Sequence, residues 1–195
     1  DIDAWESLAS DGVSASVHSA KGVEGNALVL EFNLANTAGY AAATRKLPTK
    51  LPDDYEISFW MRAEAKRNHF EVKFVDASGD NGWWYRRANF QFSGEWQQVR
   101  IKRRQIEFAW GPTTDKTLRE FQSIEFVLAA GDEGGNGNLW FDRLSLKPLQ
   151  PQRAVPPPTA KASSEATGGS AALAIDGKTG TMWRSARTDA ATPPN

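Results

Sequence analysis

The sequence predicts an all-β protein, an antiparallel β-sandwich of the jelly-roll type. Short segments alternate apolar and polar residues, turn-forming Gly, Asn, Asp and Pro separate them, and no long segment has the period of an amphipathic helix. Turn signals recur about every 8–12 residues, a spacing typical of sandwiches and barrels. With 40% apolar residues and eight tryptophans, the chain can fill a core between two sheets.

The expected strands alternate most clearly where Tyr55, Ile57, Phe59 and Met61 share one side. Phe70, Val72 and Phe74 repeat this pattern against Glu71 and Lys73. Residues 117–121 are expected to form one helical turn or a loop. The expected strands cover residues 13–17, 27–34, 39–45, 55–62, 70–74, 83–92, 96–102, 106–110, 124–128 and 139–146.

The segment from Trp83 to Phe92 is expected to be one strand with two different faces. Strict alternation places Trp84, Phe90 and Phe92 on one face, which we predict to be the core. The opposite face carries Trp83, Tyr85, Arg87, Asn89 and Gln91. Aromatic rings mixed with planar polar groups suit stacking on the apolar face of a sugar while hydrogen-bonding its hydroxyls. The alternative is a rim of half-buried aromatic residues over a solvated sheet face.

Charge and cysteine content exclude several classes of partner. The 23 basic and 24 acidic residues leave a net charge of −1, so no overall field attracts nucleic acid or an anionic membrane. The absence of cysteine excludes disulfides and thiolate metal sites. No apolar run approaches the roughly 18 residues of a membrane-spanning helix, so no membrane span is predicted. The chain begins at Asp1, as a processed or trimmed piece of a larger protein would.

The composition changes after residue 147. Residues 148–159 are rich in proline and predict an extended linker. Residues 160–195 contain few large apolar side chains, too few for a core of their own. This segment is expected to be disordered, docked on the first domain, or the opening of a second one.

Residues 1–147 resemble the galactose-binding-like jelly-roll carbohydrate-binding modules, which are accessory domains of secreted polysaccharide-degrading enzymes. The matching features are Trp5-Glu6, the segment 25–30, Gly94-Glu95-Trp96 and the segment 139–144. This resemblance implies a glycan ligand and a secreted, periplasmic or cell-surface setting in a bacterium. Other domains of the same parent chain are the second expected partner.

Residues 160–195 resemble the start of a discoidin or coagulation-factor C-type domain. The matching segments are 160–165, 174–178 and 181–185. Only about the first quarter of such a domain is present, so the resemblance does not imply a complete set of binding loops.

The first resemblance also implies a structural calcium ion where the first and last strands meet. The matching acids are Glu6 and Asp142, with backbone carbonyl groups of residues 24–26 as further oxygen ligands. The alternative is that Asp142 caps a loop amide or pairs with Arg143.

Ligand contacts are expected from an open sheet face, which Glu71 and Lys73 could extend. The alternative function is a spacer domain whose aromatic face packs against another domain, and the least expected one is a small glycosidase using Asp3 or Glu6. His18 and His69 stand alone, and no zinc, nucleophile-elbow or phosphate-loop motif occurs, so no enzyme activity is expected. The predicted ligand-binding residues are Trp60, Arg62, Trp83, Tyr85, Arg87 and Asn89.

Overall fold

The computed structural model describes residues 2–35, 37–150 and 158–186 of the 195-residue chain. The chain divides into two compact units, Asp1–Pro151 and Gln152–Asn195. This boundary falls inside the predicted linker 148–159, whose residues 151–157 lie outside the described part.

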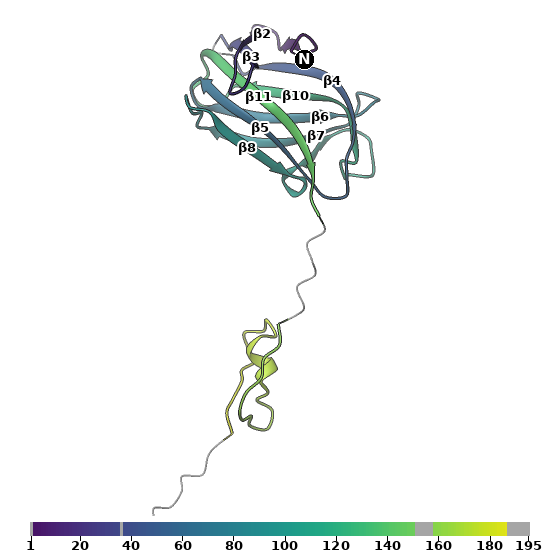
Figure 1. The fold of residues 1–195 in the computed structure, drawn as a ribbon, viewed down its shortest axis with the longest axis vertical. Helices are drawn as coiled ribbons and strands as arrows, with labels where there is room; N and C mark the ends of the chain where they lie inside the picture. The colour runs from purple at the N-terminus through teal and green to yellow at the C-terminus, as the bar shows by residue number, and fades with distance from the viewer. Residues whose placement is uncertain (1, 36, 151–157, 187–195) are drawn as a thin grey trace, which may run out of the picture. The chain divides into compact units, whose positions relative to one another are not determined.

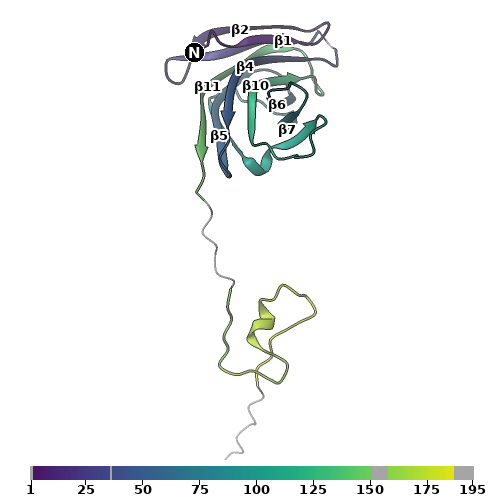
Figure 2. The ribbon, with the colours of Figure 1, turned by 90° about the vertical axis from the view of Figure 1, so that its right-hand side faces the viewer.

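The first unit is a sandwich of two antiparallel sheets, which confirms the predicted fold class. Figure 1 shows β11 and β5 overlying β10 and β6, and Figure 2 separates the same two layers after a quarter turn. In spatial order, the six-stranded sheet contains β1 (Glu6–Ala9), β4 (Tyr40–Lys50), β10 (Glu120–Ala129), β6 (Asn68–Val75), β7 (Gly82–Phe90) and β9 (Glu107–Trp110). The five-stranded sheet contains β2 (Ser14–Lys21), β3 (Asn26–Asn33), β11 (Asn136–Pro148), β5 (Tyr55–Glu64) and β8 (Gln97–Lys102).

Two segments differ from the sequence-based expectation. The edge strand β1 was not predicted, because its only large apolar side chain, Leu8, is 43% exposed and no alternation marks it. Residues 117–119 form a loop, one of the two expected alternatives, but the loop is shorter than expected because β10 begins at Glu120. Phe121 is buried although the register with β4 shifts between Phe121 and Ser123. A short 3-10 helix, Arg103–Gln105, follows β8.

The core lies between the two sheets and is organised by stacked aromatic rings. Phe126 of β10 stacks on Phe141 of β11 with centroids 4.1 Å apart, and Phe59 of β5 meets Phe126 edge-on at 4.9 Å. Trp5 stacks on the same Phe126 at 5.3 Å. Offset stacking and edge-to-face contacts are the favourable geometries for such rings. These contacts tie the opposed sheets together and leave the outer face of each sheet free for other roles.

The predicted faces of β7 are reversed in its first half. Trp83 and Tyr85 are only 6% and 9% exposed and belong to the core, whereas Trp84 points outward. Asn68 pairs with Phe90 but Phe70 pairs with Arg87, so two residues of β7, Ala88 and Asn89, lie opposite the single residue His69 of β6. Such a β-bulge inserts one extra residue and switches which side chains face inward. Phe90 therefore packs on the core together with Trp83, which strict alternation excluded.

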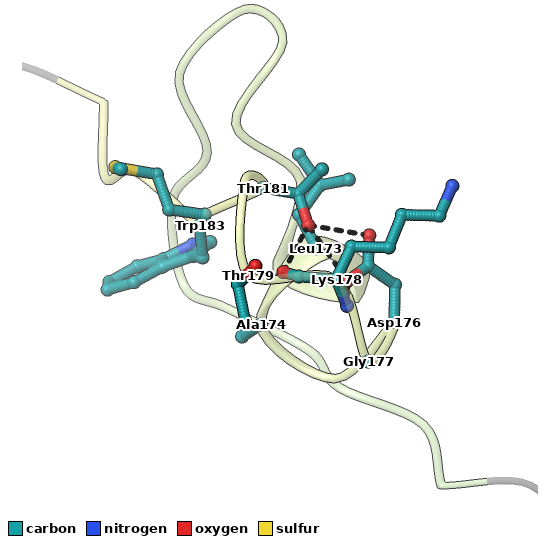
Figure 3. Close-up of a pocket in the computed structure, with 9 residues that line it drawn as sticks. Leu173, Ala174, Asp176, Gly177, Lys178, Thr179, Thr181 and Trp183 are labelled. Atoms are coloured by element: carbon teal, nitrogen blue, oxygen red, sulfur yellow. Dashed lines mark hydrogen bonds between the residues drawn. The ribbon is translucent and has the colours of Figure 1, made fainter.

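The second unit is described over residues 158–186. A 3-10 helix, Ala171–Ala174, is capped by Ser170, whose hydroxyl oxygen accepts a hydrogen bond from the Ala172 amide. The Ala166 amide donates to the Arg184 carbonyl at 2.9 Å, which joins the two ends of the unit. Figure 3 shows the loop after the helix, where the Thr181 hydroxyl contacts the Asp176 carboxylate. Among the described residues of this unit, the only buried hydrophobic residue is Ala171, in agreement with the expected lack of a core.

Candidate functional site

The structure distributes the predicted ligand-binding residues over three environments. Trp60 and Arg62 lie on β5, on the outer face of the five-stranded sheet, because Phe59 and Met61 between and beside them face the core. Trp83 and Tyr85 are core residues, so their prediction as an open ligand face is wrong. Arg87 and Asn89 belong to the bulge at the end of β7. The bulge is locked in place: Asn89 has φ +45°, and its amide donates to His69 Nδ1 at 3.0 Å.

The outer face of the six-stranded sheet instead gathers aromatic and charged side chains. Because Phe70, Val72 and Phe74 face the core, Glu71 and Lys73 point outward, as the sequence predicted. The register places Arg86 opposite Glu71, and both Trp84 and Glu125 opposite Lys73. We call this surface the six-stranded face and define it by Tyr40, Glu71, Lys73, Trp84, Arg86, Trp110 and Glu125.

A carboxylate shared by two cations lies at the centre of the six-stranded face. Glu71 is only 5% exposed, with Lys73 Nζ 3.4 Å from its Oε2 and Arg86 Nε 3.1 Å from its Oε1. A buried carboxylate is costly unless paired charges and hydrogen bonds compensate it. Both cations pair with this one carboxylate, so the charged groups of this face are fixed before any ligand binds.

Two aromatic rings flank Lys73. Its Nζ lies 5.1 Å from the Tyr40 ring centroid and 5.9 Å from that of Trp110. Tyr40 belongs to β4 and Trp110 to β9, which are separated by β10, β6 and β7. At about 4.8 Å per strand, those two strands are roughly 19 Å apart across a flat sheet. The two rings therefore lean toward each other over the sheet, with the ammonium group between them. On the same face, the Arg86 guanidinium lies 5.4 Å from the Trp84 ring centroid.

Trp110 reaches this face because of a second irregularity and a glycine. The register between β7 and β9 shifts between Gly82 and Trp83, so Phe108 pairs with the inward Trp83 while Trp110 pairs with Gly82. The indole of Trp110 then lies against the Gly82 backbone, where an added Cβ would come within 2.2 Å of the ring. Glycine at this position is what permits the close approach.

Glu125 adds a titratable group next to Lys73. Burial raises the pKa of the Glu125 carboxyl above its ordinary value, and the neighbouring Lys73 charge only partly opposes this. The protonated carboxyl can donate a hydrogen bond, whereas the ionised form only accepts. The hydrogen-bonding character of this face therefore depends on pH.

The predicted calcium residues lie in different sheets, Glu6 in β1 and Asp142 in β11. Asp142 Oδ2 accepts hydrogen bonds from the Val23 amide at 2.8 Å and the Glu24 amide at 3.2 Å. Arg143 forms an ion pair with Glu24 at 3.2 Å. Asp142 thus caps the loop between β2 and β3, which was the alternative to a calcium ligand. Over the described ranges, no three His, Cys, Asp or Glu side chains are grouped so as to hold a metal ion. Calcium binding stays a prediction.

The residues of the six-stranded face that sequence reasoning missed are Tyr40, Trp84, Arg86, Trp110 and Glu125. The alternation of β6 was sufficient to place Glu71 and Lys73 outward, and this part of the prediction agrees with the structure. Nothing in the sequence of β7 or β9 alone signals their bulges, although Gly82 beside two tryptophans was a hint of a close backbone contact.

Within the described part of the chain, no helix is long and apolar enough to cross a bilayer.

Comparisons with known proteins identify relatives of the fold. No family model matches the chain, and no curated protein matches it. The family 11 carbohydrate-binding module of a cellulosomal cellulase from Clostridium thermocellum is 20% identical with a TM-score of 0.61, over 76% of this chain and 90% of that one. The module from that organism in complex with a β-1,3-1,4-mixed-linked tetrasaccharide is 20% identical with a TM-score of 0.60, over 74% of this chain and 88% of that one.

An exo-β-agarase is 12% identical with a TM-score of 0.51, over 78% of this chain but only 24% of the agarase. These similarities concern the fold and lend no support to the discoidin resemblance of residues 160–195, which stays a prediction. The chain has the β-sandwich jelly-roll fold of these carbohydrate-binding modules.

Proposed function

We propose that the β-sandwich is a non-catalytic carbohydrate-binding module that holds a glycan on the six-stranded face. The observation that carries this proposal is the position of Lys73, within 6 Å of the ring centroids of both Tyr40 and Trp110 and 3.4 Å from the Glu71 carboxylate. Rings on both sides of fixed polar groups form a surface that matches alternating apolar faces and hydroxyl edges of sugars.

The chemistry of this surface favours sugars over purely apolar ligands. Aromatic rings gain roughly 25 cal/mol for each Å² of apolar sugar surface they bury. Lys73 and Arg86 present charged hydrogen-bonding groups whose positions are set by their ion pairs with the buried Glu71 carboxylate. Prior fixation reduces the entropy lost when a ligand binds.

The comparison with the tetrasaccharide complex supplies the first probe. Because a module of similar fold was solved with a β-1,3-1,4-mixed-linked tetrasaccharide, a mixed-linkage β-glucan is the neutral ligand to test here. We further propose that the chain works outside the cell, as an accessory region of a bacterial polysaccharide-processing protein, in agreement with the resemblance of residues 1–147. We also propose that residues 160–195 are the start of a discoidin-like domain.

Isothermal titration with the mixed-linkage tetrasaccharide tests the proposal on the full chain. Trp110→Ala is expected to weaken binding about tenfold or more, since it removes a ring that is 38% exposed and available for stacking. Trp183→Ala is the matched control, because it removes an indole of similar exposure, 42%, from the other unit. A folded protein that binds neither this ligand nor any glycan on an array would instead support a spacer whose aromatic face packs against another domain.

A further inference from the structure

The outer face of the five-stranded sheet carries a second set of aromatic residues that the function proposed above does not use. Ile57, Phe59 and Met61 of β5 face the core, as do Val99 and Ile101 of β8, so the residues between them point outward. The register pairs Trp60 with Gln98, Ser58 with Arg100 and Glu56 with Lys102. We call this surface the β5–β8 strip and define it by Glu56, Ser58, Trp60, Arg62, Trp96, Gln98, Arg100 and Lys102.

One end of the strip is a rigid stack of planar groups. The Arg62 guanidinium lies 3.8 Å from the Trp140 ring centroid and 5.8 Å from that of Trp96, and Glu64 pairs with it at 3.4 Å. Trp140 and Trp96 also pack on a small cluster with Ala27 and Val29, outside the core between the sheets. These contacts fix the orientation of the Trp96 ring and of Arg62.

The strip as a whole is basic, although Arg62 at its first end pairs with Glu64 and Glu56 lies opposite Lys102 at its other end. Of its eight residues, Arg62, Arg100 and Lys102 are basic and only Glu56 is acidic. Arg100 donates from Nε and Nη2 to the Gln98 amide oxygen at 3.0 and 2.8 Å, which holds the guanidinium at Gln98, the residue opposite Trp60. The chain continues from Lys102 into Arg103 and Arg104, both exposed. The six-stranded face differs, because its lysine and arginine are both engaged by Glu71.

From this arrangement we infer that the β5–β8 strip is a second carbohydrate site, specific for an acidic polysaccharide whose sugars bear carboxylates. Sugar rings stack on Trp60 and Trp96, and the carboxylates pair with Arg100 and Lys102. The outward side chains from residue 56 to residue 62 span about 20 Å, at roughly 3.3 Å per residue. The strip can therefore contact several consecutive sugar units. A neutral polysaccharide binds it more weakly than an acidic one, because a neutral chain cannot form the ion pairs with Arg100 and Lys102.

The test uses the full chain with two probes, polygalacturonate oligosaccharides and the neutral mixed-linkage tetrasaccharide, measured by isothermal titration. Arg100→Gln and Trp60→Ala are expected to weaken polygalacturonate binding about tenfold while leaving the neutral ligand unaffected. Trp110→Ala is expected to do the reverse. Lys50→Gln, which removes an exposed cation at the end of β4, is the control for nonspecific charge. Polygalacturonate binding should also fall as sodium chloride is raised.

Several results would overturn the inference. No polygalacturonate binding by the folded protein would do so, and so would binding that Lys50→Gln weakens as much as Arg100→Gln. A change in sedimentation coefficient on Trp60→Ala, without any polygalacturonate binding, would show that the strip is a contact between copies of the chain. The neutral-ligand titrations, recorded on the same samples, report separately on the six-stranded face, so failure of one site is distinguishable from failure of the other.

Discussion

Substituting Gly82 by alanine should disable the six-stranded face without unfolding the sandwich. An added Cβ would lie 2.2 to 2.5 Å from three atoms of the Trp110 indole. Carbon atoms pack at about 3.5–4.0 Å, so the ring must move by roughly 1–2 Å. No left-handed backbone conformation is required at Gly82, so the substitution acts through the ring and not through backbone strain.

The size of the effect follows from where Trp110 lies. A displacement above about 0.5 Å is enough to spoil a preorganised binding site. We expect binding of the mixed-linkage tetrasaccharide to weaken about tenfold, or about 1.4 kcal/mol, close to the effect of Trp110→Ala. Because Trp110 is 38% exposed on an edge strand, the loss of folding free energy should stay near 1 kcal/mol.

A double-mutant cycle measured by isothermal titration, with urea denaturation of each variant, separates these effects. If Gly82 acts only by seating the ring, Gly82→Ala should change binding little in a chain that already carries Trp110→Ala. Full affinity in the single Gly82→Ala variant, or additive losses in the double variant, would refute the reasoning.

Three further predictions address burial, titration and metal. Trp83→Ala should cost about 3–5 kcal/mol of unfolding free energy in urea, since Trp83 is buried and its Nε1–H donates to the Lys116 carbonyl at 2.7 Å; a selective loss of glycan binding with unchanged stability would contradict its core position. Since burial raises the folded-state pKa of Glu125 above 4.5, its stabilising contribution should be complete below about pH 4.5 and be lost as pH rises through the folded-state value; Glu125→Gln should flatten this part of the profile of stability against pH, and an unchanged profile would reject the assignment. If Asp142 binds calcium, a chelator should lower the Tm of the parent protein but not that of Asp142→Asn. The stability lost would be up to about 2.7 kcal/mol if calcium had been present at a hundredfold excess over its Kd. Equal Tm values for the parent protein with and without chelator would leave Asp142 only its capping role.

Local patterns predicted the elements well where the alternation was uninterrupted. β5 and β6 emerge with the faces that their sequences indicate, so the outward positions of Trp60, Arg62, Glu71 and Lys73 were all predictable. The prediction failed in β7 because Phe90 and Phe92 were taken to share a face with Trp84. Strict alternation supports that inference only when every residue of the strand is paired one to one.

The second unit shows the limit of composition as a guide. Over residues 158–186, Ala171 is the only buried hydrophobic residue, and Met182 and Trp183 are exposed. Composition says nothing about which surface such side chains would cover. The resemblance to a discoidin domain stays a prediction for the same reason.

The sequence by itself determined the fold class and which side chains share a face of each regular strand, because these depend on local periodicity and turn chemistry. Only the tertiary structure decided that Trp60 and Trp83 do not share a surface. It also decided that Trp84 and Trp110 lie on the six-stranded face. The register shifts in the β6–β7 and β7–β9 pairs and the close contact of Trp110 with Gly82 depend on strand pairing and cannot be read from either strand alone. Alternation states which residues lie on the same side of a strand; strand pairing decides which side meets the other sheet and where one extra residue reverses the order.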